Sequence, residues 1–441
     1  MRTYGNLPRI LASCLLSLLV PARAGAAGVA SVGTASSKEP AYSWVQVTSS
    51  APWSARSLHA VAVLNDTVCL SGGAGPPPVG SEVWLSSDGT SWSLATVEPS
   101  WQDRWGHSMV GFNNNLWVLG GYSRVSGDVN DVWYSSSGSS WFKATQSAAW
   151  SARIWHAACA YDDNIWIMGG LGPRAENLND VWYSQDGIAW AISTDNAPWS
   201  GRYGHSCVVV SDTLWLISGK RYEQDRFTYF RDVWRTSDGV NWTQATAGAP
   251  WHGRAAHAAL AFDNKLWVLG GGYYEGTWVD EHLVLLNDVW YSSDGATWTE
   301  LPDTPWSPRS GHAAAVFKGK LWIFGGSTIS DNTILDLNDI WYLARPHSAD
   351  TDRDWAISVR EIGRVVGLYN AGAYRCDSTT QDGYAPFQGP HDCGPHDSDY
   401  DPEDWSISLS ELSRLVTFYN AGGYNADPDT PDGFAPGTSA R

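Results

Sequence analysis

The sequence predicts an all-β fold, a six-bladed β-propeller, followed by a small α-helical C-terminal unit. An Arg-x-x-His element recurs six times, and its histidines lie 48 to 55 residues apart: His59, His107, His156, His205, His257 and His312. A glycine pair closes the next apolar run in five copies, with Ser218-Gly219 in the fourth, and a tryptophan follows each time. Repeats of this length that contain four short strands are typical of propeller blades.

Composition and charge agree with this fold class and exclude some functions. A chain of 441 residues is too long for one ordinary core, so we expect more than one domain. The 28 tryptophans and 19 tyrosines favour sheet, because large flat side chains pack well on pleated surfaces. A net charge of -18 argues against a nucleic-acid partner, which requires basic surface.

The N-terminus has the features of a secretory signal. Residues 1–26 combine Arg2 and Arg9, an apolar run and a small-residue cleavage site at Ala22-Arg23-Ala24 or Ala24-Gly25-Ala26. Residues 27–40 are small and polar and form a predicted linker. No later stretch approaches the roughly 18 apolar residues that span a bilayer, so we predict no membrane span. The sequence therefore predicts a secreted protein, with cell-surface association as an alternative.

Residues 41–345 supply the strands of the predicted propeller. Each repeat begins with a tryptophan-containing turn such as Pro198-Trp199, and a short strand such as residues 258–262 follows the histidine. The second strand ends in the glycine pair, and the third contains the later tryptophan. An Asp-Gly turn, which suits tight hairpins, leads to the fourth strand. Four antiparallel strands per repeat are therefore expected.

The last repeat is incomplete. It ends near Leu343 without a fourth strand, whereas residues 43–48 have the fourth-strand pattern at the start of the domain. We expect this N-terminal strand to complete the sixth blade and to lock the ring, because an open edge would invite aggregation.

With their glycine pairs and spaced tryptophans, these repeats resemble kelch repeats, and the domain resembles a kelch propeller such as the central domain of galactose oxidase. The resemblance implies binding through the face that carries the loops after the glycine pairs. Aromatic side chains beside charged ones can stack on sugars or anchor a peptide. The candidate ligand-binding residues are Arg174, Arg221, Tyr222, Phe227, Tyr229, Tyr273, Tyr274 and Trp278.

Two function classes remain open. We favour a recognition protein that binds a glycan or an extracellular protein, and we assign no catalytic residue. The alternative is a sugar-active enzyme that resembles the exported bacterial sialic-acid mutarotases, whose acid–base pair could include Glu223, Glu275 or Glu281. The six arginines could hold an anion, but their sixfold repetition favours buried hydrogen bonds that every blade needs.

Residues 346–441 contain two acidic repeats with calcium-loop spacing. Carboxylates at this spacing wrap a hard cation, so we expect Ca²⁺. The ligands of copy one are Asp350, Asp352, Asp354, Ala356 through its carbonyl, Ser358 and Glu361. Those of copy two are Asp399, Asp401, Asp404, Ser408 and Glu411. A helix with one apolar face follows each loop.

Two loop–helix copies resemble dockerin modules of secreted bacterial proteins, or EF-hand halves. The resemblance implies a cohesin-like or cell-surface partner. The chain departs from the pattern in three ways. Trp355 and Trp405 occupy the sixth loop position, where glycine is usual. Copy two has one extra residue, and both loops end in Glu where dockerins have Asp.

The cysteines divide into two groups. Cys376 and Cys393 lie between the two C-terminal helices, and an exported protein is expected to pair them in a disulfide. The alternative is a metal site of His391, Cys393 and His396. Cys69, Cys159 and Cys207 lie in apolar strands and are expected to be packed free thiols.

Overall fold

The structure is a computed structural model that describes residues 42–75, 78–96, 101, 103–275, 282–345, 347, 349, 357–377, 380, 384–389, 396–400, 405–426, 430 and 433–437. The predicted signal peptide, 1–26, and linker, 27–40, lie outside these residues. The chain forms two compact units. The larger contains Thr48–Phe317 and Trp322–Trp341, and the smaller contains the chain from Tyr342 on.

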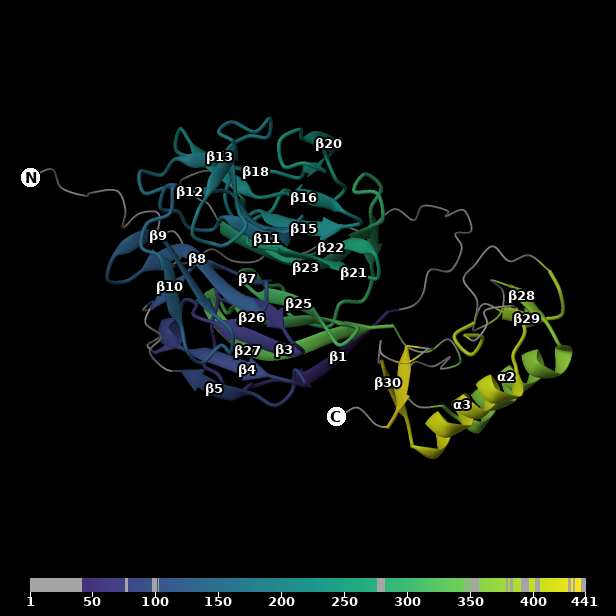
Figure 1. Ribbon diagram of the computed structural model, residues 1–441. Helices are drawn as coiled ribbons and strands as arrows, with labels where there is room; N and C mark the ends of the chain where they lie inside the picture. Colours follow the sequence, from purple (N-terminus) through teal and green to yellow (C-terminus); the bar gives the residue numbers. More distant parts are fainter. Residues whose placement is uncertain are drawn as a thin grey trace, which may run out of the picture. The chain divides into compact units, whose positions relative to one another are not determined.

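The larger unit confirms the predicted six-bladed β-propeller (Figure 1). Blade one contains β2 Ala60–Leu64, β3 Thr67–Ser71, β4 Val83–Ser86 and β5 Ser93–Thr96, with the 3-10 turn η1 Val79–Ser81. Blade two contains β7 Ser108–Phe112, β8 Asn115–Ser123, β9 Gly127–Ser135 and β10 Phe142–Thr145, with the short β6 Arg104–Trp105 paired to β8. Blade three contains β11 Ala157–Tyr161, β12 Asn164–Leu171, β13 Asn177–Ser184 and β14 Ala191–Thr194.

The remaining blades differ most in their connections. Blade four contains β15 Ser206–Val210, β16 Thr213–Ile217, β19 Val233–Thr236 and β20 Thr243–Thr246, and its connection folds into a separate hairpin of β17 Lys220–Glu223 and β18 Arg226–Tyr229. Blade five contains β21 Ala258–Phe262, β22 Lys265–Glu275, β23 His282–Ser292 and β24 Thr299–Leu301. Blade six contains β25 Ala313–Phe317, β26 Lys320–Ser330 and β27 Thr333–Ala344, in a sheet of order β1-β27-β26-β25 with β1 Ser43–Thr48.

Blade six also contacts blade one through the main chain. The backbone N–H of Gly326 donates to the Arg56 carbonyl at 2.9 Å, and that of Ala51 donates to the Asn338 carbonyl at 2.8 Å. These bonds join the first and last repeats independently of β1. The proposal that β1 locks the ring stays a prediction.

The Asp-Gly hairpins are stabilised by side-chain oxygens that accept the backbone N–H groups of the turn. In blade one the Ser86 hydroxyl accepts the Gly89 N–H at 2.8 Å, and an Asp88 carboxylate oxygen accepts the N–H groups of Thr90 and Ser91 at 2.7 Å. Gly89 has a φ of +78°, which glycine adopts without strain. A Cβ on Gly89 would also lie only 2.4 Å from the Trp322 ring of blade six. The hairpin therefore joins neighbouring blades as well as neighbouring strands.

The smaller unit contains two helices and two short hairpins (Figure 1). Helix α2 spans Val359–Ala371 and α3 spans Leu409–Asn420; each is followed by a hairpin, β28 Tyr374–Cys376 with β29 Tyr384–Pro386 and β30 Tyr424–Ala426 with β31 Phe434–Pro436. Our expectation of loops and helices alone was therefore incomplete. Val365 and Leu368 of α2 and Leu415 and Phe418 of α3 share one core. Neither described helix is long and apolar enough to cross a membrane.

Candidate functional site

The six repeated arginines are structural. Arg153 is fully buried, and its guanidinium donates to both carboxylate oxygens of Asp180 at 2.7 Å and to the Gly169 carbonyl at 2.9 Å. The corresponding pairs are Arg56–Glu82, Arg104–Asp131, Arg202–Asp232, Arg254–Asp288 and Arg309–Asp339. Because each guanidinium is already neutralised inside a blade, the arginines do not form an anion site. The structure favours the interpretation based on buried hydrogen bonds.

The histidines explain the glycine pairs. A Cβ on Gly120 would lie 3.2 Å from Cε1 of His156 in the next blade, and a Cβ on Gly121 would lie 2.6 Å from Cβ of His107. Each ring therefore occupies space that a glycine leaves open. Burial, followed by the charge of Arg153, lowers the pKa of His156 to about 3. The buried histidines are consequently neutral at ordinary pH.

Blade four replaces the first glycine with Ser218. This residue has a φ of +55°, which is strained for a residue with a Cβ. Its hydroxyl accepts the indole N–H of Trp251 at 3.1 Å. The corresponding indole nitrogens of Trp101, Trp150 and Trp199 have no hydrogen-bond partner among the described residues. A specific hydrogen bond thus accompanies the one departure from the glycine pair.

A closed ring of main-chain hydrogen bonds links the Arg-x-x-His loops of all six blades. The residue before each histidine donates its N–H to the carbonyl of its counterpart in the preceding blade, at 2.7 to 3.0 Å. The ring consists of Leu58, Gly106, Trp155, Gly204, Ala256 and Gly311. All six have positive φ, and Trp155 is at +53°. Strained non-glycine residues persist where the surrounding structure fixes them, and they cluster at functional sites.

The Arg-x-x-His loops and the loops after the glycine pairs lie on one face of the propeller. Antiparallel bridges join them within a blade, as between Ile154 and Leu171 and between Tyr203 and Lys220. In blade two the same contact is the pairing of β6 with β8, where Trp105 faces Tyr122. We call this the loop face.

Aromatic rings of blades two to four make an unbroken series of contacts on the loop face. The Trp105 ring lies 4.9 Å from that of Tyr122 and 5.6 Å from that of Trp155, measured between centroids. Trp155 in turn stacks on Tyr203 at 5.5 Å. Trp105 and Tyr203 are buried, whereas Tyr122 and Trp155 are half-buried. The half-buried rings of Tyr122 and Trp155 are therefore held in place by contacts with the buried rings.

Lys220 connects this series to the aromatic residues of blades four and five. Its Nζ lies 5.3 Å from the Tyr203 ring centroid and 4.7 Å from that of Phe227. Phe227 stacks on Tyr274 of blade five at 5.7 Å, with ring planes 18° apart. The two contacts of the Lys220 ammonium group fall within the usual 6 Å range of cation–π interactions.

Two further ring contacts extend the series along the boundary of blades four and five. Tyr229 meets Tyr273 edge-on at 6.3 Å, and His252 stacks on Tyr273 at 4.8 Å. We call the whole set the aromatic arc; its members are Trp105, Tyr122, Trp155, Tyr203, Lys220, Tyr222, Phe227, Tyr229, His252, Tyr273 and Tyr274.

The predicted ligand-binding residues divide into four cases. Tyr222, Phe227, Tyr229, Tyr273 and Tyr274 all belong to the aromatic arc. Arg221 instead pairs with Glu223 at 3.3 Å on the same hairpin. Arg174 is exposed in the blade-three loop, where its backbone N–H donates to the Glu176 carboxylate at 2.8 Å. Trp278 lies outside the described residues.

The sequence-based prediction missed Trp105, Trp155, Tyr203, Lys220 and His252. Three of these stand inside the Arg-x-x-His elements of blades two, three and four, whereas the other blades have Ser57-Leu58, Ala255-Ala256 and Ser310-Gly311 there. The repeat breaks its symmetry at these two positions. This variation inside an otherwise uniform element is the signal in the sequence that marks the three aromatic residues.

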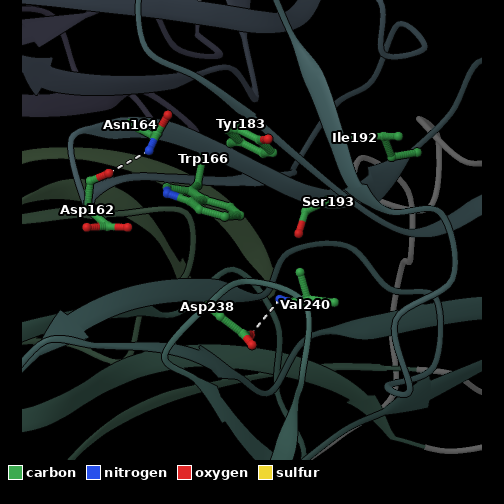
Figure 2. Close-up of a pocket in the computed structure, with 8 residues that line it drawn as sticks. All are labelled: Asp162, Asn164, Trp166, Tyr183, Ile192, Ser193, Asp238 and Val240. Atoms are coloured by element: carbon green, nitrogen blue, oxygen red, sulfur yellow. Dashed lines mark hydrogen bonds between the residues drawn. The ribbon is translucent and has the colours of Figure 1, made fainter.

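A cavity of about 300 Å³ lies between blades three and four, at the Asp238-Gly239 hairpin of blade four; Figure 2 shows the residues that line it. Strand directions place the Asp-Gly hairpins, and with them this cavity, opposite the loop face. The polar groups that line the cavity form hydrogen bonds within the propeller. Asp238 accepts the N–H of Val240 at 2.9 Å, and the Ser193 hydroxyl donates to the Gly239 carbonyl at 2.9 Å. We assign no function to this cavity.

The predicted calcium loops are described only in part. Asp350, Asp352, Asp354, Ala356, Asp401 and Asp404 lie outside the described residues. Ser358 and Ser408 cap α2 and α3, and each forms a capping box with Glu361 or Glu411. Among the described positions, no group of three or more His, Cys, Asp or Glu side chains is placed to hold a metal ion.

In copy two the described residues include the two ends of the predicted loop. Asp399 and Glu411 are both 2% exposed. Asp399 accepts the Trp405 N–H at 2.8 Å, and Glu411 accepts the Tyr400 N–H at 2.9 Å. Trp405, at the position where glycine is usual, has a φ of +63°, so this tryptophan adopts the conformation that glycine normally supplies. Asp399 and Glu411 are two of the predicted calcium ligands of copy two, and in the structure both carboxylates are buried and accept main-chain N–H groups.

The cysteines lie as follows. Cys69, Cys159 and Cys207 are free thiols. Cys376 is disulfide-bonded, but Cys393 lies outside the described residues, so their pairing stays a prediction. His391 lies outside the described residues as well, and the alternative metal site is untested for the same reason.

Comparisons with known proteins agree with this architecture. A model of the KLHDC2/KLHL20/DRC7 Kelch-repeats domain matches residues 58–271 and 188–347. The Caenorhabditis elegans protein tag-53 is 30% identical over 96 residues, which are 20% of this chain and 7% of tag-53, so the chain spans less than a tenth of that relative. The solved structure titled "Structure of YjhT" has a TM-score of 0.55 at 18% identity, over 67% of this chain and 96% of its own, which shows a shared fold alone. Because the family model covers all six blades, the chain belongs to the KLHDC2/KLHL20/DRC7 Kelch-repeats domain family.

Proposed function

We propose that this chain is a recognition protein that binds a glycan or an extracellular protein through the aromatic arc. One observation carries the proposal: the ring contacts from Tyr122 to Tyr273 are confined to blades two to five, whereas the buried arginines and histidines repeat in all six. A feature of every blade is explained by the fold. A feature that breaks the repeat requires another explanation, and function is located in such sites.

The chemistry of the arc suits recognition. Half-buried rings such as Trp155 and Tyr274 offer flat apolar faces that stack on sugar rings or cover peptide side chains. Rings that are already held by neighbours lose little conformational entropy when a ligand binds. Lys220 and Arg221 add hydrogen-bond donors for hydroxyl or carbonyl oxygens.

A binding screen with the full chain tests the proposal. The chain is applied to a glycan array and to a panel of immobilised extracellular proteins, alongside Tyr274→Ala and Phe142→Ala. Phe142 is a matched control because it is an aromatic residue, 56% exposed, on the fourth strand of blade two and outside the arc. A ligand whose binding requires Tyr274 but not Phe142 supports the proposal. Equal loss in both variants would contradict it.

We propose in addition that the smaller unit binds Ca²⁺. The buried carboxylates of Asp399 and Glu411 and the left-handed turn at Trp405 support this, as does the spacing of the acidic residues that precede them. Glu361 and Glu411 would close the two loops around the ions, and the ions would stabilise the fold by binding it in preference to the unfolded chain. Melting of the full chain with Ca²⁺ and with EGTA tests this, because the smaller unit should melt earlier in EGTA.

Export of the protein is the remaining part of the proposal. The features of residues 1–26 support secretion, which would also favour the Cys376–Cys393 disulfide. The smaller unit would then attach the propeller to a cohesin-like or cell-surface partner. N-terminal sequencing of protein recovered from culture medium should begin at Ala27 or Gly25. Intact Met1 on intracellular protein would contradict export.

A further inference from the structure

The interface between blades three and four contains two cysteines that face each other. Alternate residues of β11, Ala157, Cys159 and Tyr161, pack into the core layer shared with blade four. Cys207 and Val209 of β15 pack into the same layer from the other side. The intervening Ala158 and Ala160 belong to the layer shared with blade two. Cys159 therefore faces blade four, and Cys207 faces blade three.

The Cys159 and Cys207 side chains pack in the same core layer, close enough to interact. The hydrogen bond with Cys207, followed by burial, raises the pKa of Cys159. Strands β11 and β15 have Cα atoms within 8 Å of each other, and disulfides typically join Cα atoms about 4.4 to 6.8 Å apart. Both cysteines are free, and both are partly exposed, unlike Cys69, which is fully buried.

Packing alone does not require cysteine at this place. Cys159 is the third residue after its histidine, and Cys207 is the second after its own. The other five junctions fill these positions with apolar pairs: Ala62–Met109, Val110–Ala158, Val208–Ala259, Leu260–Ala314 and Ala315–Val61. Only the junction of blades three and four places two thiols opposite each other.

We propose that Cys159 and Cys207 form a redox-active pair that closes into a disulfide between blades three and four. The oxidant is a low-molecular-weight disulfide such as oxidised glutathione. One thiolate attacks it, forming a mixed disulfide and releasing one glutathione thiolate, and the second thiolate displaces the other. Two protein thiols lose two protons and two electrons, and one glutathione disulfide becomes two thiols. The cross-link ties two blades that the chain otherwise connects only through their intervening strands.

Peptide mapping of the full chain tests this. The protein is incubated with oxidised glutathione, its remaining thiols are alkylated, and it is digested without reductant. We expect a cross-linked peptide pair containing Cys159 and Cys207, lighter by two hydrogens than the separate peptides, while Cys69 is alkylated. The rate should rise with pH, because the thiolate is the attacking species. Alkylation of both Cys159 and Cys207, or a stable glutathione adduct without the cross-link, would overturn the proposal.

Melting adds a second readout. The oxidised chain should melt about 5 °C higher than the reduced chain, because the bond closes a long loop in the unfolded state. Cys159→Ala and Cys207→Ala should each abolish this shift, and Cys69→Ala should keep it. Alanine occupies equivalent positions at other junctions, so these variants are expected to fold. An equal shift in Cys159→Ala would assign the effect to another thiol and refute the pair.

Discussion

The indole ring of Trp155 stacks on the ring of Tyr203, with centroids 5.5 Å apart and planes 19° apart. The two residues come from the same loop of adjacent blades, and the Gly204 N–H donates to the Trp155 carbonyl at 2.9 Å. The main-chain ring that joins the blades therefore also fixes the aromatic arc. The main-chain hydrogen bond between blades three and four thus positions two rings of the surface that we propose for recognition.

Loss of a buried arginine should destabilise the propeller strongly. Arg153→Met leaves the Asp180 carboxylate without its bidentate partner, and we expect the free energy of unfolding to fall by about 3 kcal/mol or more. Denaturant unfolding measures the change. Arg221→Met is the matched control, because the Arg221 and Glu223 side chains are 38% and 56% exposed and ion pairs at the surface contribute about 0 to 1 kcal/mol. Equal small effects in both variants would contradict a structural role for Arg153.

Crowding at the hairpin glycines is testable separately from their backbone conformation. Gly187 and Gly127 have similar φ values, +67° and +73°. A Cβ on Gly187 would lie 2.1 Å from the Trp117 ring, whereas one on Gly127 meets nothing within 4 Å. We expect Gly127→Ala to cost about 1 to 2 kcal/mol from positive φ alone. Gly187→Ala should cost about 1 to 3 kcal/mol more from overpacking. Similar melting temperatures for the two variants would argue against interlocked blades.

Acid should destabilise the propeller through its histidines. The pKa values of His59, His156 and His257 are lowered to about 3, chiefly by burial, whereas unfolded histidine titrates near 6.5. Between these values the unfolded chain binds protons that the folded chain does not, so stability falls as pH decreases from about 6.5 towards 3. Asp128, whose pKa burial raises to about 6, acts in the opposite sense.

Several histidines act together in this window. Denaturant unfolding at pH 8, 6, 5 and 4 should therefore give a slope steeper than about 1.4 kcal/mol per pH unit, which is the limit for one histidine. A stability that stays constant from pH 8 to pH 5 would contradict the burial of neutral histidines.

The calcium proposal makes a prediction for Glu411. Glu411→Gln should weaken Ca²⁺ binding and remove much of the Ca²⁺-dependent rise in melting temperature of the smaller unit. The variant also alters a helix cap, so the readout is the difference between melts with Ca²⁺ and with EGTA rather than either melt alone. Glu223→Gln, on the exposed blade-four hairpin, is the control. An unchanged Ca²⁺ effect in Glu411→Gln would remove this residue from the site.

The repeats made the propeller predictable. Histidines, glycine pairs and Asp-Gly turns recur in register. Each of these features has a local structural cause that is the same in every blade where it occurs, so the blades could be predicted from the sequence. Connections outside the repeated pattern were harder to predict from the sequence. The β17–β18 hairpin and the hairpins after α2 and α3 consist of short strands whose formation depends on packing as much as on local sequence.

The candidate site was predictable in part. Tyr222, Phe227 and Tyr274 stand in loops that differ visibly between blades, and the structure brings them together. Trp155 stands inside a repeated element that also serves the fold, and only the ring of six blades shows which neighbour it meets. The contact of Cys159 with Cys207 likewise depends on the facing of two strands 48 residues apart.

The most direct measurement of the central claim is a titration of the ligand from the binding screen against the full chain, Tyr274→Ala and Phe142→Ala. The account predicts that Tyr274→Ala weakens binding by about 2 kcal/mol, or roughly thirtyfold in Kd, with an unchanged melting temperature, and that Phe142→Ala binds like the parent chain. Unchanged affinity in Tyr274→Ala, or an equal loss in Phe142→Ala, would contradict recognition through the aromatic arc.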